Sequence, residues 1–231
     1  DSINPGVYIN NLKTNSSKQI HISHKKTKYF KLNLSNSGDK LAFVKDADST
    51  KTYQRPYELY LWDSSQKNSK LILDMKSSPD GYKVSPYGDI KFSKNESKLY
   101  FGLGLPEIVQ DTLLLDEEIV NVEVWTYDEP RLYTVQEKQI ENDMKKSFQT
   151  VYHIKDERLI QIATKEFPIA ILSDEGNGDF ALISNPKPYQ LSSQWTALYS
   201  MNDLAVMNIN NGDTKLAIKS NPSTARFSPN G

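Results

Sequence analysis

Short apolar segments alternate with polar turns along most of the chain. Residues 34–43 (LSNSGDKLAF) and residues 92–101 (FSKNESKLYF) share one order: an apolar segment, a polar turn and a second apolar segment. The turns contain Gly, Asn and Asp, which accept the positive φ angles of tight hairpins. Residues 172–182 repeat the order with a longer turn, and residues 227–231 begin it again. The pattern therefore predicts a repeated β-hairpin.

A second hairpin is expected after each complete copy of the first. These second hairpins lie at residues 57–74, 150–162 and 204–218. Two hairpins give four antiparallel strands in about 50 to 60 residues, which is the size of a β-propeller blade. Segments such as 59–62 are apolar at nearly every position, as expected when each blade is covered on both faces. We therefore expect an all-β fold, a fragment of a β-propeller with four-stranded antiparallel blades.

The whole chain, residues 1–231, is expected to form one partial propeller. Complete blades are expected near residues 28–76, 86–165 and 167–220, with partial blades at 1–24 and 225–231. Because the partial blades do not supply all the strands of a closing blade, we expect the chain to be a piece of a longer protein. Its end blades would then present apolar faces, and we expect the isolated chain to self-associate through them.

The middle blade contains an insertion. Ser35, Ser93 and Ser173 begin the turns of the three copies, 58 and then 80 residues apart. The additional residues fall between the second and third strands of the middle blade. Within them, residues 133–147 carry apolar side chains at helical intervals, which predicts one short inserted helix.

Composition and charge exclude several classes of protein. The chain has 28 Lys and Arg residues against 29 Asp and Glu residues, so its formal net charge of −1 does not favour binding to nucleic acid. Without cysteine it can form no disulfide, no thiolate zinc site and no cysteine nucleophile. Its longest apolar runs are far shorter than the roughly 20 residues of a membrane-spanning helix, so no membrane span is expected.

One stretch of the chain resembles a known family. Residues 122–130 (VEVWTYDEP), which lead to Gln136 and the predicted helix, are similar to part of the N-terminal propeller of dipeptidyl-peptidase-like secreted serine peptidases of the prolyl oligopeptidase superfamily. Residues 185–190 (NPKPYQ) resemble the same group. The motif FSPNG at 227–231 is shared more widely, with TolB-like propellers as well.

The resemblance implies a function for the longer protein. The propeller would cap a C-terminal α/β-hydrolase domain and restrict access to short peptide substrates, and the protein would be extracytoplasmic, either periplasmic or secreted. A TolB-like propeller that acts as a protein-interaction scaffold is the alternative. The chain itself contains no G-x-S-x-G nucleophile motif, and its three histidines have no acidic partner in a recognisable motif. We therefore expect no catalytic residue, no cofactor and no metal in this chain.

The candidate substrate-binding residues lie in the insertion. The resembled dipeptidyl peptidases hold the free amino terminus of a substrate with a pair of propeller glutamates, which points to Glu117 and Glu118. The apolar residues around this pair do not match the family's motif, and a solvated start of a strand is the alternative. Trp125 and Arg131 are candidates for a peptide-binding rim, since aromatic residues and Arg anchor interfaces. The alternative for both is packing of the insertion against its own blade.

The histidines offer no metal site in this interpretation. His21 and His24 are three residues apart, so in a strand they would point to opposite faces and could not share a metal ion. We expect both to be surface residues.

Overall fold

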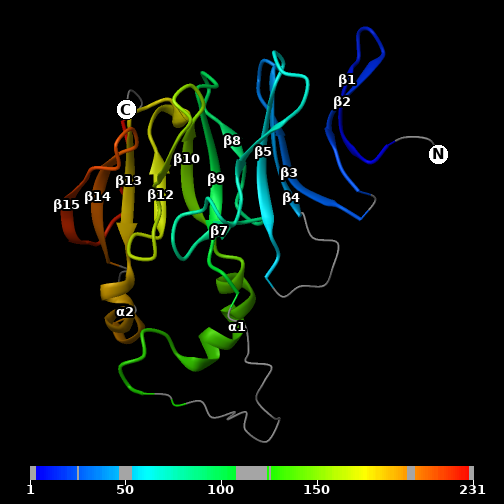
Figure 1. The fold of residues 1–231 in the computed structure, drawn as a ribbon. Coiled ribbons are helices and arrows are strands. Elements are labelled where there is room, and N and C mark those ends of the chain that lie inside the picture. The colour runs from blue at the N-terminus through cyan, green and yellow to red at the C-terminus, as the bar shows by residue number, and fades with distance from the viewer. Residues whose placement is uncertain are drawn as a thin grey trace, which may run out of the picture.

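The chain is described by a computed structural model that covers residues 4–24, 26–46, 54–107, 124, 126–196 and 201–228. Within these residues, antiparallel sheets follow one another in the order of the sequence, and the helices lie outside them (Figure 1). An all-β propeller fragment of four-stranded antiparallel blades is the fold class that the hairpin repeat predicts, and the structure confirms it.

The first four-stranded sheet is a simple antiparallel meander. Its strands are β3 (Lys28–Leu34), β4 (Lys40–Asp46), β5 (Tyr57–Asp63) and β6 (Lys70–Leu73), paired in that order. Two further strands precede it, β1 (Gly6–Asn11) and β2 (Ser16–Ile22). In the described part of the chain, β1 and β2 pair with each other and with no other strand.

The middle sheet differs from this pattern at its first strand. The strands are β7 (Lys83–Val84), β8 (Lys91–Phe92), β9 (Lys98–Gly104), β10 (Phe148–His153) and β11 (Arg158–Gln161). Both β7 and β8 pair with β9, β7 near its end and β8 near its beginning. The two short strands β7 and β8 therefore occupy together the position that one longer first strand, β3, fills in the first sheet.

The third sheet returns to the simple meander. It contains β12 (Ile169–Leu172), β13 (Phe180–Asn185), β14 (Asn202–Asn208) and β15 (Thr214–Asn221). A short 3₁₀ helix, η1 (Asp174–Gly176), lies in the turn between β12 and β13, where the sequence has the longer form of the repeat.

Two α-helices interrupt the strands. The inserted helix expected at 133–147 is present as α1 (Tyr133–Met144), between β9 and β10. The second helix, α2 (Gln190–Thr196), is not predicted by the sequence pattern, and it follows the 3₁₀ helix η2 (Lys187–Tyr189) between β13 and β14. None of the described helices is long and apolar enough to cross a membrane.

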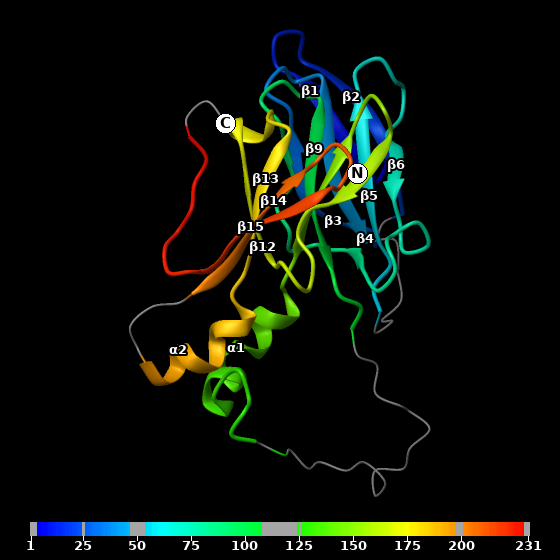
Figure 2. The ribbon, with the colours of Figure 1, turned by 90° about the vertical axis from the view of Figure 1, so that its left-hand side faces the viewer.

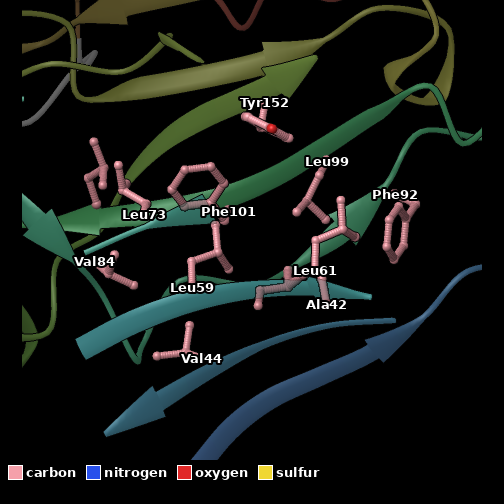
Figure 3. Packing of buried hydrophobic residues seen from close by; sticks show 12 residues of the cluster. Ala42, Val44, Leu59, Leu61, Leu73, Val84, Phe92, Leu99, Phe101 and Tyr152 are labelled. Atoms are coloured by element: carbon pink, nitrogen blue, oxygen red, sulfur yellow. The ribbon is translucent and has the colours of Figure 1, made fainter. Parts of the chain in front are cut away.

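The cores lie between neighbouring sheets. One core fills the space between the first and middle sheets, where Leu59 and Phe101 are almost completely buried (Figure 3). A second core, which contains Tyr100, lies between the middle and third sheets, and a third, which contains Phe43, lies between β1–β2 and the first sheet. Tyr100 and Phe101 are neighbours in β9 yet belong to different cores, because successive side chains of a strand point to opposite faces. The middle and first sheets are therefore apolar on both faces.

Polar contacts between turns join the sheets at one end. Glu96, in the turn before β9, accepts hydrogen bonds from the Ser37 backbone N–H (2.6 Å) and hydroxyl (2.7 Å), and from Lys40 Nζ (3.3 Å). Lys98 makes the equivalent contact with the third sheet by donating to the carbonyl oxygens of Asn177 (2.6 Å) and Gly178 (2.8 Å). Each turn between the first two strands of a sheet is thus tied to the corresponding turn of the next sheet.

The histidines do not all lie on the surface. His24 is exposed, as expected, but His21 is only 8% exposed, so the expectation of a surface position is wrong for that residue. The β1–β2 hairpin packs one face against the first sheet, and His21 lies on that face. His153, at the end of β10, is also buried, and its Nε2 lies 2.8 Å from the Ile209 carbonyl oxygen.

We expect Glu96→Gln to lower the free energy of unfolding by about 1–2 kcal/mol at pH 7, because hydrogen bonds to a charged group are lost. The bonds from Ser37, followed by the contact with Lys40, lower the pKa of Glu96 to about 2. A carboxyl with a lowered pKa stabilises the fold above its ordinary pKa, and this contribution is lost as the pH falls from about 4.5 to about 2. Urea unfolding at several pH values measures the effect, and the difference in free energy of unfolding between wild type and variant should close over that range.

Asp89→Asn is the control, since Asp89 is 90% exposed in its pair with Lys31 and should contribute little. An equal effect of both variants would contradict the prediction.

Candidate functional site

The insertion and α2 lie at the same end of the sheets. The insertion leaves the middle sheet after β9 and returns at β10, and α2 lies in the corresponding connection of the third sheet. Both helices project from this end in two perpendicular views (Figures 1 and 2). Gln194 of α2 donates a hydrogen bond through Nε2 to the Pro130 carbonyl oxygen of the insertion, so the two connections are in contact. We treat this surface, formed by the described residues of 105–147 and by 186–196, as the candidate site.

A buried ion pair fixes the beginning of the insertion. Lys83 of β7 is paired with Glu107, and the Lys83 side chain is only 6% exposed. Its Nζ also lies 5.4 Å from the centre of the Tyr57 ring, within the range of a cation–π interaction. A buried ammonium group without a partner would destabilise the fold, so Glu107 is held in place where the insertion begins.

A second ion pair lies beside the first. Arg55 contacts the carboxylate of Asp46, which is 3% exposed at the end of β4, with an Nε to Oδ2 distance of 3.0 Å. Burial, followed by the negative charge of Asp46, raises the pKa of the Tyr57 hydroxyl to about 12, so Tyr57 is neutral at physiological pH. These charges are paired with one another, and the cluster is suited to supporting the insertion rather than to acid–base chemistry.

Close backbone contact shapes the other side of the insertion's base. Gly88 and Gly102 approach each other so closely that a Cβ atom built on Gly102 would lie 2.7 Å from Gly88 Cα and 2.8 Å from Ser147 Cβ. Ser147 is the last residue before β10. The absence of a side chain at residue 102 therefore allows the returning chain to pack against the segment between β7 and β8.

Arg131 is the one candidate substrate-binding residue that lies within the described part of the chain. It lies just before α1, and its guanidinium donates to Gln139 Oε1 (2.7 Å) and to Asp143 Oδ2 (2.6 Å). Gln136 Nε2 donates in turn to the Arg131 carbonyl oxygen (2.8 Å). These contacts are all within the insertion and hold the segment before α1 against the helix.

The other three candidates, Glu117, Glu118 and Trp125, lie outside the described residues. Their roles, and that of Arg131 as a substrate contact, stay predictions.

The apolar side chains of α1 were used to predict the helix but were not proposed as part of a site. The described helix buries no residue, and Tyr133, Ile140 and Met144 are 53%, 53% and 73% exposed. They are seven and four residues apart, so they lie along one side of the helix. The spacing of Ile140 and Met144 was part of the signal for the helix, but the sequence alone does not show that the other described elements leave these two side chains exposed.

A groove of about 220 Å³ lies away from the insertion, on the first strands of the first and middle sheets. It is lined by Asn33, Leu34, Ser35, Asn36, Lys91, Phe92, Lys94 and Glu175. Lys94 and Glu175 face each other across it at 3.5 Å. Neither this groove nor any other group of described residues gathers three side chains that could bind a metal ion.

We expect Gly102→Ala to lower the free energy of unfolding by about 1–3 kcal/mol, because the new methyl group would overlap the Gly88 backbone and Ser147. Gly104→Ala is the matched control in the same strand, since a Cβ there would lie 3.4 Å from Ser85 Cβ. Thermal or urea unfolding measures both variants. Equal stability of the two would show that the close contact at Gly102 is relaxed in solution.

No protein-family profile and no curated protein matches the sequence. Among solved structures, the chain is similar to the β-propeller domain of the Trilobed protease from Pyrococcus furiosus, with 14% identity over 92% of this chain and 48% of that chain and a TM-score of 0.47. It is similar to the acylaminoacyl peptidase of Pyrococcus horikoshii, with 16% identity over 92% of this chain and 27% of that chain and a TM-score of 0.42.

The chain is also similar to a putative TolB from Agrobacterium tumefaciens, with 8% identity over 90% of this chain and 86% of that chain and a TM-score of 0.25. It spans about half the length of the Trilobed protease propeller and about a quarter of the acylaminoacyl peptidase. The solved structures to which the chain is similar thus include the propeller domain of a protease and a peptidase. Most of the peptidase chain lies outside the part that matches this chain.

Proposed function

We propose that the chain is the non-catalytic propeller portion of a secreted serine peptidase, located outside the cytoplasm. One observation carries this proposal. The stretch 122–130, which resembles dipeptidyl-peptidase-like propellers, belongs to an insertion that leaves a propeller sheet between its second and third strands. The division into blades near 28–76, 86–165 and 167–220, with partial blades at both ends, is part of the same proposal.

The role proposed for this portion is to cap a C-terminal α/β-hydrolase domain and to restrict access to short peptides. Ile140 and Met144 of α1, which the other described residues leave 53% and 73% exposed, support a contact with another domain at this end of the sheets. The buried pair between Lys83 and Glu107 supports a fixed origin for that contact.

Within this role, Glu117 and Glu118 would bind the free amino terminus of a peptide, and Trp125 and Arg131 would line its path. Two carboxylates are suited to a protonated amine because opposite charges attract strongly in a partly buried site. Arg131 already holds Asp143 and Gln139, so its part would be to position the insertion as well as to contact the peptide.

We expect no hydrolysis by this chain alone, because peptide hydrolysis needs an activated nucleophile and an oxyanion hole, and the sequence contains no motif for either. A fluorophosphonate probe that labels active serines should leave the isolated chain unlabelled. The same probe should label a protein extended through the sequence that follows Gly231 in its gene. Labelling of the isolated chain that a single Ser substitution abolishes would contradict the proposal.

Restriction of access to short peptides is tested with the protein that is extended through the sequence that follows Gly231. Chromogenic dipeptides and tripeptides should be hydrolysed, and an unfolded polypeptide of protein size should not. Replacement of residues 108–146 by a short turn, which keeps Glu107 paired with Lys83, should reduce this discrimination.

A TolB-like propeller that binds a protein partner is the alternative function. The motif FSPNG at 227–231 resembles TolB-like propellers as well as the peptidase propellers. An extended protein that contains no G-x-S-x-G motif and is not labelled by the probe would favour this alternative over the peptidase.

Self-association of the isolated chain is the remaining proposal about partners. One face of the third sheet packs on the middle sheet, and Ile171, Phe180 and Ile218 on the other face are 42%, 47% and 52% exposed. A face of this kind is covered in a propeller by the next blade, and in an isolated fragment a second copy of the chain can cover it.

We expect light scattering at micromolar concentration to show a mass above that of the monomer. The double variant Ile171→Lys, Ile218→Lys should shift it toward the monomer, because charged side chains on an apolar face oppose association. Leu12→Lys is the control, since Leu12 is 94% exposed in the β1–β2 turn, away from this face. A strictly monomeric wild-type chain would contradict the expectation.

A further inference from the structure

The β1–β2 hairpin is held to the first sheet mainly by side chains. In the described part of the chain its strands pair only with each other. One backbone hydrogen bond crosses to the first sheet, from Ser69 N–H to the Ile20 carbonyl oxygen at 2.8 Å. Side chains make the rest of the contact. Ile20 packs with Phe43 and Trp62 in a small core, and Lys18 Nζ donates to the Gln66 carbonyl oxygen at 3.1 Å and lies 5.2 Å from the centre of the Trp62 ring. A change at a single side chain can therefore alter how firmly the hairpin is held.

His21 lies at the centre of this contact. Its Nδ1 is 2.8 Å from the hydroxyl oxygen of Ser69, and its ring meets three aromatic rings of the first sheet edge-on. The distances from the His21 ring centre are 4.5 Å to Tyr60, 5.4 Å to Phe43 and 6.0 Å to Tyr29. The imidazole is thus enclosed by a hydroxyl group and apolar ring edges.

The second ring nitrogen has no partner among the described residues. His21 Nε2 is buried without a hydrogen bond to any described residue. A protonated imidazole donates from both nitrogens. In the tautomer whose Nδ1–H donates to the Ser69 hydroxyl oxygen, protonation at Nε2 adds a charge and a buried N–H donor with no acceptor among the described residues, which is unfavourable in this position.

The charged groups that face His21 come from β4 and β5. Lys45 and Glu58 form an ion pair with a 3.2 Å Nζ to Oε2 distance, and the Tyr60 hydroxyl also donates to Glu58. Burial lowers the pKa of His21, the positive charge of Lys45 lowers it further, and Glu58 acts in the opposite direction. The surroundings as a whole favour neutral imidazole.

We propose that His21 is a pH-sensitive contact between the β1–β2 hairpin and the first sheet, which holds the hairpin when the imidazole is neutral and releases it when the imidazole is protonated. When the hairpin is released, the imidazole enters water and regains its ordinary pKa of about 6.5.

The direction of the pH effect follows from linkage. A histidine whose pKa is lower in the docked state stabilises docking fully above about pH 6.5. As the pH falls further, docking weakens by about tenfold for each pH unit, until the pKa of the docked imidazole is reached. Mild acid is thus expected to loosen the hairpin while the three large sheets remain folded.

Trp62 reports on this contact. It is 4% exposed and belongs to the same small core, and the chain contains two other tryptophans, Trp125 and Trp195. In the background Trp125→Phe, Trp195→Phe, all tryptophan fluorescence comes from Trp62. Between pH 7.5 and 5 we expect its emission to shift to longer wavelength in one step, with unchanged far-ultraviolet circular dichroism.

Substitutions decide whether His21 causes this step. His21→Phe keeps an aromatic ring against Tyr60 and Phe43 but cannot be protonated, so the step should disappear. His21→Gln serves as a second neutral variant should the larger ring fail to fold. The matched controls are His24→Gln, at the exposed histidine three residues away, and His153→Gln, at the buried histidine of another core, and both should retain the step.

The proposal is overturned if the wild-type background shows no step, or if the step survives in a folded His21 variant. It is also overturned if His24→Gln or His153→Gln abolishes the step. A histidine titration by NMR provides an independent measurement: the signal of His21 should titrate below the ordinary imidazole pKa of about 6.5.

Discussion

The sheets of this chain depend on being covered on both faces. Successive residues of one strand enter different cores, as Phe43 and Val44 do in β4, and Tyr100 and Phe101 in β9. A strand of this kind has no face for solvent, so a single sheet could not be stable by itself. The sheets must therefore stand side by side, and polar contacts between them are made at strand ends, in turns and in connections. Every candidate for function in this protein lies in those places for the same reason.

The hairpin repeat made the fold predictable because it depends on local residue types. Apolar strands and Gly, Asn or Asp turns recur at 34–43 and 92–101, and these segments form the expected pairs of strands. The split into β7 and β8 was not predictable from a pattern. A two-residue strand has no periodicity, and Lys83 is buried only because Glu107, 24 residues later, meets it. The seven residues of α2 are likewise too few for a helical period to be distinguished from a loop.

The candidate site was predictable to a smaller extent. Helical spacing located α1, but the contacts of Arg131 with Gln139 and Asp143 depend on how the preceding segment turns back along the helix. The burial of His21 was not predictable either, because it also depends on how separate segments of the chain pack together. The alternation of side chains along a strand predicts that His21 and His24 occupy opposite faces, but which face is covered depends on how the first sheet, residues 28–73, packs on the hairpin.

The two ends of the sheets differ in how far the lengths of their loops can change. Between the first and second strands of each sheet the turns are short, and one residue in the turn before β9, Glu96, must reach Ser37 of the neighbouring sheet. An added residue in that turn would carry the carboxylate away from its partners. Between the second and third strands, the middle sheet already accommodates residues 105–147, whose origin is fixed by Glu107 and whose return passes Gly102. New sequence can therefore be added at this end without a change in the register of any strand, so the molecule can be diversified at one end while the other keeps the sheets aligned.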